Sequence, residues 1–111
     1  MKRDFYVFQE DLIGFKLGID NVTLSEFARI INQTFGSPDM KKLRVESLIE
    51  FLVKKKMIRR DETGILIPTL KGRAVGINQQ TRINTSNKEY MVNVYSKNVL
   101  SYILDNIYKI I

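Results

Sequence analysis

Two amphipathic helices in close succession constrain the fold of this 111-residue chain more than any other sequence feature. Thr23 stands three residues before Glu26, which is the capping-box spacing that begins a helix. One helical face then carries apolar residues at helical spacing: Leu24, Phe27, Ala28, Ile31 and Phe35. Gly36 can take the left-handed conformation that ends this helix, and the Ser-Pro-Asp sequence of residues 37–39 begins another. The sequence therefore predicts two helices joined by a tight turn.

The second helix is predicted over about residues 38–56, and its apolar stripe sets which side faces the core. That stripe contains Val45, Leu48, Ile49 and Leu52. At roughly 100° per residue, the opposite face carries Leu43, Ser47, Glu50 and Lys54, and the flanks carry Arg44, Glu46 and Phe51. Replacing Leu48 with alanine is therefore expected to cost far more stability than replacing Leu43. Two short helices with a glycine-containing turn are typical of a helix-turn-helix, whose second helix is the recognition helix.

Two hairpins and a last helix are predicted after this pair. Short apolar segments on either side of residues 61–64 predict a hairpin with a four-residue loop, which beside a helix-turn-helix is a wing. Residues 69–76 favour a short helix or turn, and residues 81–84 and 89–95 favour a second hairpin. Ser96 is expected to cap a final amphipathic helix with one apolar face: Val99, Leu100, Ile103, Leu104, Ile107 and Ile111.

These elements predict the α+β class and a single domain over residues 1–111. Residues 23–77 form a small winged helix-turn-helix, and residues 78–111 add a C-terminal β-hairpin and an amphipathic helix. The apolar face of that helix is either core or a two-fold dimer seam, because Ile110 and Ile111 extend it to the last residue.

The net positive charge of the chain is confined to residues 41–73. This stretch has ten basic and four acidic residues, which accounts for the whole net charge of +6, and the other 78 residues carry eight of each. A localised positive face on a helix-and-wing scaffold indicates a polyanion partner, most simply double-stranded DNA. The predicted nucleic-acid-binding residues are Lys41, Lys42, Arg44, Ser47, Lys54, Lys55, Lys56, Arg59, Arg60, Lys71 and Arg73.

Arg44 and Ser47, near the start of the predicted recognition helix, are the candidates for reading base edges, and the lysines and the other arginines are candidates for phosphate contacts. Glu46 and Glu50 argue against DNA, because carboxylates on that helix repel phosphates. Either Glu50 pairs with Lys54, or these carboxylates accept from a cytosine amino group. Tyr90 and Tyr95 are more typical of strand packing than of base stacking.

The order of these motifs resembles a known family. TLSEFARIIN at residues 23–32, an Ile-Arg-Arg strand end at 58–60 and PTLKGRAVG at 68–76 resemble the KilAC-type winged helix-turn-helix domain at the C-terminus of phage antirepressors. The resemblance covers about residues 23–77. It implies a winged-helix fold and a role as a phage-type transcriptional regulator or antirepressor.

Composition argues against an enzyme. The chain has no cysteine and no histidine, which excludes disulfides, thiolate nucleophiles and the common zinc sites. The carboxylate pairs at residues 10–11 and 61–62 do not converge by spacing, and Gly14 and Gly18 lack the Gly-Lys-Ser/Thr of a phosphate loop. We therefore expect no catalytic site, no cofactor and no metal. The charged N-terminus and the lack of an apolar run of about 18 residues predict a cytoplasmic protein that does not engage a membrane.

Two functional classes remain open. The first is a winged-helix DNA-binding protein. The second is a small protein interaction module, such as an antirepressor or inhibitor, that binds an acidic protein surface, a repressor or another nucleic-acid-binding protein.

Overall fold

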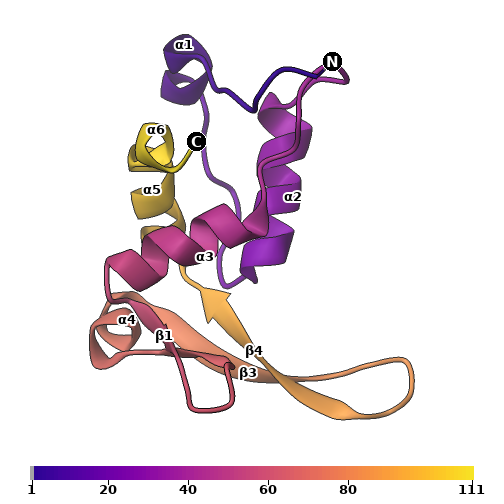
Figure 1. Cartoon of the computed structure of the whole chain (residues 1–111), viewed down its shortest axis with the longest axis vertical. Helices are drawn as coiled ribbons and strands as arrows, with labels where there is room; N and C mark the ends of the chain where they lie inside the picture. Colours follow the sequence, from indigo (N-terminus) through magenta and orange to yellow (C-terminus); the bar gives the residue numbers. More distant parts are fainter. Residues whose placement is uncertain (1) are drawn as a thin grey trace.

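The computed structural model describes residues 2–111, and in this range it contains six helices and two antiparallel hairpins (Figure 1). The helices are α1 (Gln9–Ile13), α2 (Leu24–Phe35), α3 (Val45–Lys54), α4 (Leu70–Val75), α5 (Lys97–Asp105) and α6 (Ile107–Ile110). The strands are β1 (Ile58–Arg60), β2 (Leu66–Pro68), β3 (Ile77–Ile83) and β4 (Glu89–Tyr95). The predicted α+β class is confirmed.

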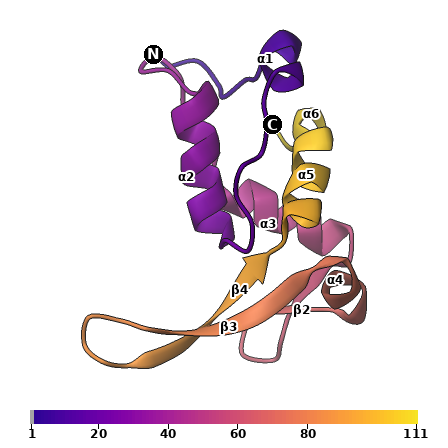
Figure 2. The same ribbon diagram turned by 180° about the vertical axis from the view of Figure 1, so that it is seen from behind.

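Helix α3 crosses between α2 on one side and α5 and α6 on the other, and both hairpins lie at one end of the molecule (Figures 1 and 2). The core fills the space where these helices meet. Its large, fully buried side chains on α2, α3, β1, β3, α5 and α6 are Phe27, Ile31, Leu48, Leu52, Ile58, Ile77, Leu100, Ile103 and Ile107. The apolar face of each amphipathic helix therefore packs against other elements of the same chain.

Helix α2 begins where the sequence predicts. The Thr23 side chain accepts a hydrogen bond from the Glu26 backbone N–H at 3.2 Å. The Glu26 carboxylate does not reach back to the Thr23 N–H, as a full capping box requires, but accepts from Arg82 Nη1 at 2.6 Å. This hydrogen bond from Arg82 holds the pKa of Glu26 below its usual value. The first turn of α2 is thereby tied to strand β3.

The tight turn predicted between α2 and the next helix is wrong. Gly36 is extended, with φ of −74°, and α3 begins at Val45 rather than at residue 38. The Asn32 side chain explains the difference, because its amide donates to the Leu43 carbonyl at 3.1 Å and accepts from the Leu43 N–H at 2.7 Å. These two bonds replace helical ones, so residues 36–44 form a non-helical connection along α2, with one turn closed by the Met40 N–H and the Ser37 carbonyl at 3.0 Å.

The predicted faces of the second helix also need correction. Leu43 precedes α3 and is 6% exposed, so it belongs to the core and not to the opposite face. Phe51, expected on a flank, is buried beside Leu48 and Leu52, whereas Val45 and Ile49 are only half-buried. The outward edge of α3 presents Glu46, Glu50 and Val53.

Both hairpins are present with shifted bounds. Strands β1 and β2 enclose a five-residue loop, residues 61–65, closed by a bond from the Asp61 N–H to the Ile65 carbonyl at 2.8 Å. Strand β3 begins at Ile77, four residues earlier than predicted, and pairs along its length with β4. The result is a long β3–β4 ribbon that reaches well beyond the helices (Figure 1).

The C-terminal helix is interrupted at Asn106, which separates α5 from α6. Ser96 occupies the predicted cap position, but its side chain donates to the Val75 carbonyl, and the Lys97 N–H is satisfied by Asp20 Oδ1 at 2.7 Å. Five of the six residues predicted for a dimer seam are buried in the chain's own core: Val99, Leu100, Ile103, Leu104 and Ile107. Ile111 is 40% exposed. This face is therefore part of the core. A dimer formed through it stays a prediction, and the five buried residues offer it no exposed surface.

Among residues 2–111, no helix combines the length and the apolar character needed to cross a membrane.

The burial of Leu43 reverses the stability order predicted from the sequence. We expect Leu43→Ala and Leu48→Ala each to lower the free energy of unfolding by about 2–5 kcal/mol, because each leaves a cavity in the core. Leu70→Ala is the matched control, since Leu70 is 88% exposed and its replacement should change stability by about 0.5 kcal/mol or less. Urea unfolding measures all three. A small loss at Leu43 would contradict its place in the core.

The Glu26–Arg82 pair makes part of the stability depend on pH. The pKa of Glu26 is lower in the folded than in the unfolded chain, so the pair stabilises the fold above the usual pKa of 4.5. That contribution is lost as the pH falls through the folded-state pKa. Glu26→Gln should lower the free energy of unfolding by about 0.5–1 kcal/mol at pH 7, and by progressively less as the pH falls below 4.5. Glu62→Gln, at an exposed position, should have no such pH-dependent effect.

Candidate nucleic-acid interface

The structure divides the ten basic residues of 41–73 into two groups at opposite ends of α3. We call the larger group, at the C-terminal end, the wing cluster: Lys54, Lys55, Lys56, Arg59, Arg60, Lys71 and Arg73. The smaller group, the loop cluster, precedes the helix: Lys41, Lys42 and Arg44. A ten-residue helix is about 15 Å long, so the two groups do not form the single continuous face that the sequence predicts.

Backbone carbonyl groups just after α3 hold together the elements that carry the wing cluster. Thr69 caps α4 by accepting from the Gly72 N–H at 3.0 Å, and its own N–H donates to the Met57 carbonyl at 3.0 Å. The Thr69 hydroxyl also lies 2.6 Å from the Lys56 carbonyl. These contacts hold α4, which carries Lys71 and Arg73, against the end of α3 and the start of β1.

Gly72 and Gly76 make this contact possible. A Cβ added at Gly72 would lie 1.9 Å from the Met57 carbonyl oxygen, which no side chain can tolerate. Gly76 ends α4 with φ of +112°, in the left-handed region that favours glycine. The Pro-Thr-Leu-Lys-Gly motif and its later glycine are therefore explained by backbone packing, and they position basic residues without being a ligand site themselves.

The tip of the first hairpin is ordered by Asp61. One carboxylate oxygen of Asp61 accepts from the Thr63 hydroxyl at 2.6 Å, the Thr63 N–H at 2.8 Å and the Ile65 N–H at 3.0 Å. These bonds, the Thr63 hydroxyl first, hold the pKa of Asp61 below its usual value. Arg60 donates to the Gly64 carbonyl at 3.1 Å. The loop therefore keeps one shape, and the negative charge of Asp61 is engaged with its own backbone.

None of the seven basic side chains of the wing cluster forms an ion pair. In the part of the chain that the structure describes, none of the seven has a carboxylate oxygen within 4.0 Å. The acidic residues nearest in sequence are Asp61 and Glu62 at the hairpin tip, and, after the Thr63 hydrogen bond, the charge of Arg59 contributes to the lowered pKa of Asp61. Three of the seven side chains have neutral partners, since Lys71 donates to the Lys55 carbonyl, Arg73 to the Gln79 side chain and Arg60 to the Gly64 carbonyl. The Glu50–Lys54 pair allowed by the sequence is not formed within this distance. The surface consequently presents concentrated positive charge to solvent.

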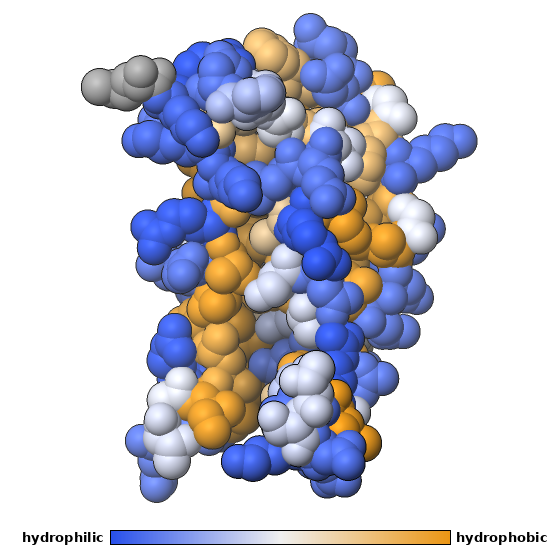
Figure 3. Space-filling view, turned by 90° about the vertical axis from the view of Figure 1, so that its right-hand side faces the viewer, coloured by the Kyte–Doolittle hydropathy of each residue, from blue (hydrophilic) through white to orange (hydrophobic). Residues whose placement is uncertain are grey.

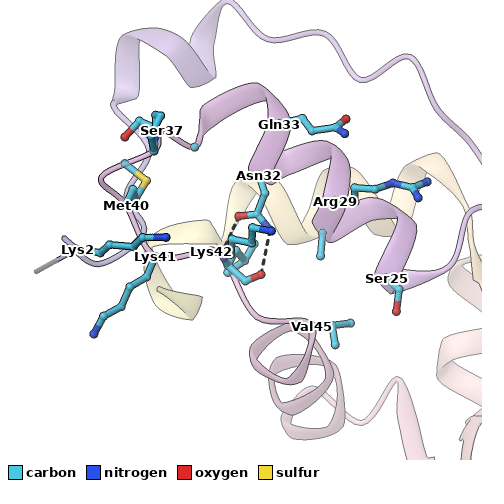
Figure 4. A pocket seen from close by; sticks show the side chains of 14 residues that line it. Lys2, Ser25, Arg29, Asn32, Gln33, Ser37, Met40, Lys41, Lys42 and Val45 are labelled. Carbon is cyan, nitrogen blue, oxygen red and sulfur yellow. Dashed lines mark hydrogen bonds between the residues drawn. The ribbon is translucent and has the colours of Figure 1, made fainter.

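The loop cluster lies beside a cavity of about 710 Å³ between α2 and residues 36–45 (Figure 4). Lys41 and Lys42 line it together with two basic residues that the sequence did not single out, Lys2 and Arg29. Figure 4 shows Lys2 and Lys41 at one end of the cavity and Arg29 at the other. Their positions come from long-range packing, namely the pairing of the N-terminal segment with residue 40, so local patterns carried no signal for them.

The loop cluster is also partly neutralised. Lys41 Nζ lies 3.5 Å from an Asp4 carboxylate oxygen, and Arg44 Nε lies 3.6 Å from Glu46 Oε2. Of the two predicted base readers, Arg44 is exposed, whereas Ser47 is half-buried in a recess that also contains Lys109 and Ile110 of α6. The sequence-predicted site is thus strongest at the wing cluster and weakest at the start of α3.

The two tyrosines of β4 differ in their exposure to solvent. Tyr95 is 2% exposed, and this burial raises its pKa to about 12, so it packs in the core as expected for a strand residue. Tyr90 is 44% exposed on the projecting part of the ribbon.

No family model, no curated protein and no solved structure matches the chain. The resemblance to the KilAC-type domain therefore stays a prediction from short motifs. Within residues 2–111, no three acidic side chains gather where they could hold a metal ion.

The close approach of Gly72 to Met57 predicts that the stability of the fold is sensitive to any side chain at residue 72. Gly72→Ala should lower the free energy of unfolding by about 1–3 kcal/mol, because the added methyl forces α4 away from the Met57 carbonyl. Gly18→Ala is the matched control, since nothing lies within 4 Å of a Cβ there. Thermal unfolding of the two variants compares them. Equal stability would show that α4 does not depend on this contact.

Proposed function

We propose that this protein binds double-stranded DNA through the wing cluster, as a winged-helix type of transcriptional regulator. The observation that supports the proposal is the set of seven basic side chains on α3, β1, α4 and the turn between α3 and β1, none of which forms an ion pair with a carboxylate. Lysine and arginine on such a surface bind successive phosphates and release counterions, which favours association with duplex DNA. A helix followed by a two-stranded hairpin is an arrangement that a winged helix shares, although α2 and α3 are not joined by the tight turn of a helix-turn-helix.

The wing is the better candidate for the centre of the interface than the middle of α3. The outward edge of α3 carries Glu46 and Glu50, and carboxylates there disfavour deep entry between two phosphate backbones. The β1–β2 loop has a fixed shape and carries Arg59 and Arg60 at its base. We expect the hairpin and the C-terminal end of α3 to approach the DNA backbone, with Arg44 the remaining candidate for a base contact.

A protein interaction module is the second candidate function. The same α3 edge favours it, because Glu46, Glu50 and the 38% exposed Val53 form a surface better suited to a protein than to DNA. An antirepressor or inhibitor, as the family resemblance implies, would use such a face to occupy another regulator.

Replacing two basic side chains with neutral polar ones tests the DNA proposal. Lys54→Gln with Arg59→Gln should weaken binding to all duplex sequences alike, since phosphate contacts carry no sequence information. The slope of log K against log salt should fall in magnitude by about 2, near 0.9 for each lost contact. Fluorescence anisotropy with a random-sequence duplex measures both quantities.

The matched control is Lys16→Gln with Lys97→Gln, which removes the same charge outside both clusters and should leave the slope unchanged. Equal slopes for the two double variants would place the wing cluster off the DNA. If the wild-type protein fails to bind duplex at micromolar concentration in low salt, the interaction module replaces DNA binding as the function.

A further inference from the structure

The loop-cluster cavity is the space between α2 and residues 36–45 (Figure 4). Ser25 and Ala28 line it from α2, and neither side chain is long enough to fill it. The connection on the other side is held beside α2 by the two hydrogen bonds between Asn32 and Leu43. Small-molecule sites commonly enclose about 300–1,000 Å³, and the volume of this cavity, about 710 Å³, lies within that range. The cavity is therefore large enough for a small organic ligand.

Positive charge is concentrated in this cavity. Within residues 2–111, its lining contains no acidic residue and four basic ones: Lys2, Arg29, Lys41 and Lys42. In the same range, only Lys41 of the four has a carboxylate oxygen within 4.0 Å, which belongs to Asp4. Figure 3 views the side of the molecule that carries α2 and shows mainly hydrophilic side chains over its upper half. Three of the four positive charges therefore have no ion-pair partner in the described chain.

The acidic residues that adjoin the lining in sequence are paired elsewhere. These residues are Glu26, Asp39 and Glu46. Their partners, which are not part of the lining, are Arg82 at 2.6 Å, Arg3 at 2.9 Å and Arg44 at 3.6 Å. The Arg82 hydrogen bond is the main cause of the lowered pKa of Glu26, and the charge of Arg29 is a smaller one. An anion in the cavity would therefore meet the positive lining while the adjacent carboxylates stay with other arginines.

The lining has charge at both ends and apolar surface between them. Lys2 and Lys41 lie at one end of the cavity, and Arg29 lies at the other (Figure 4). The buried apolar side chains of the lining are Ala28, Met40 and Leu43. A ligand that lies along the cavity thus meets two ammonium groups, then an apolar floor, then a guanidinium group. This order of groups fits an organic anion whose charge is at one end and whose body is apolar or planar.

We propose that the loop-cluster cavity binds a small organic phosphate of the size of a nucleoside monophosphate. The ammonium groups of Lys2 and Lys41 hold the phosphate, because charged donors make the stronger hydrogen bonds to such a group. The Lys41–Asp4 pair is exposed on both sides, so a phosphate displaces it at little cost. The planar base lies over the apolar floor and against Arg29, since guanidinium groups stack on planar rings. This site is separate from the wing cluster and goes beyond DNA binding.

Calorimetric titration of the full chain with the four ribonucleoside 5′-monophosphates, and with inorganic phosphate for comparison, tests the proposal. At least one nucleotide should bind about tenfold or more tightly than inorganic phosphate. Lys2→Gln with Arg29→Gln should weaken that nucleotide by about tenfold or more, because it removes one charge from each end of the cavity. Both side chains are exposed, so the fold should persist, which circular dichroism checks. Lys16→Gln with Lys97→Gln is again the matched control and should leave nucleotide binding unchanged.

Three results would overturn the proposal. They are the absence of nucleotide binding at millimolar concentration, equal binding of inorganic phosphate, which would indicate an adventitious ion only, and equal losses in the cavity variant and its control.

A phosphate of a nucleic-acid strand has the same chemistry as a free nucleotide, and a duplex separates the two sources. Lys54→Gln with Arg59→Gln should weaken duplex binding and leave nucleotide binding unchanged, so the failure of one proposal is distinguishable from the failure of the other. If Lys2→Gln with Arg29→Gln instead lowers the salt slope of duplex binding, and a random-sequence duplex displaces the nucleotide, the cavity belongs to the DNA interface. That result would overturn a separate small-molecule site.

Discussion

The carbonyl group of Met57 is the contact on which the basic end of this protein depends. It accepts from the Thr69 N–H at 3.0 Å, next to the Lys56 carbonyl that accepts from the Thr69 hydroxyl at 2.6 Å, and it lies where any side chain on Gly72 would have to be. A single oxygen thus joins the end of α3, the first strand of the wing and helix α4. Seven basic residues lie on or next to these three elements, and their positive charges repel one another. This small set of bonds holds the elements together against that repulsion.

Local patterns predicted most of the elements and missed one connection. Thr23 and the Asp61–Gly64 turn each mark a boundary through chemistry within a few residues, so the helix and the hairpin near them could be anticipated. Ser96 stands at the predicted cap position, but the bonds made there reach Val75 and Asp20, which are distant in sequence. The path from residue 36 to residue 44 could not be anticipated. Helical spacing placed Leu43 opposite the apolar stripe, but the Asn32 amide, eleven residues earlier, binds its backbone and holds the segment outside the helix.

The sequence predicted which basic residues the candidate site contains, but not how they are arranged in space. The basic residues between 54 and 73 share one end of the molecule, because α3, β1 and α4 follow one another with short connections. The late start of α3 removed Lys41 and Lys42 from that surface and placed them with Lys2 and Arg29. Long-range packing decided that grouping. Glu50 faces outward as the sequence predicts, whereas Phe51, expected on a flank, is buried.

The ion pair between Arg82 and Glu26 gives the projecting ribbon a mechanical role. The ribbon is anchored at its base by the Val22–Tyr95 bridge and by Asn93, and Arg82 adds one further attachment to the first turn of α2. Beyond Arg82, every residue from 83 to 91 is exposed. Any displacement of the ribbon at Arg82 would therefore act directly on the start of α2, the helix that also forms a wall of the loop-cluster cavity.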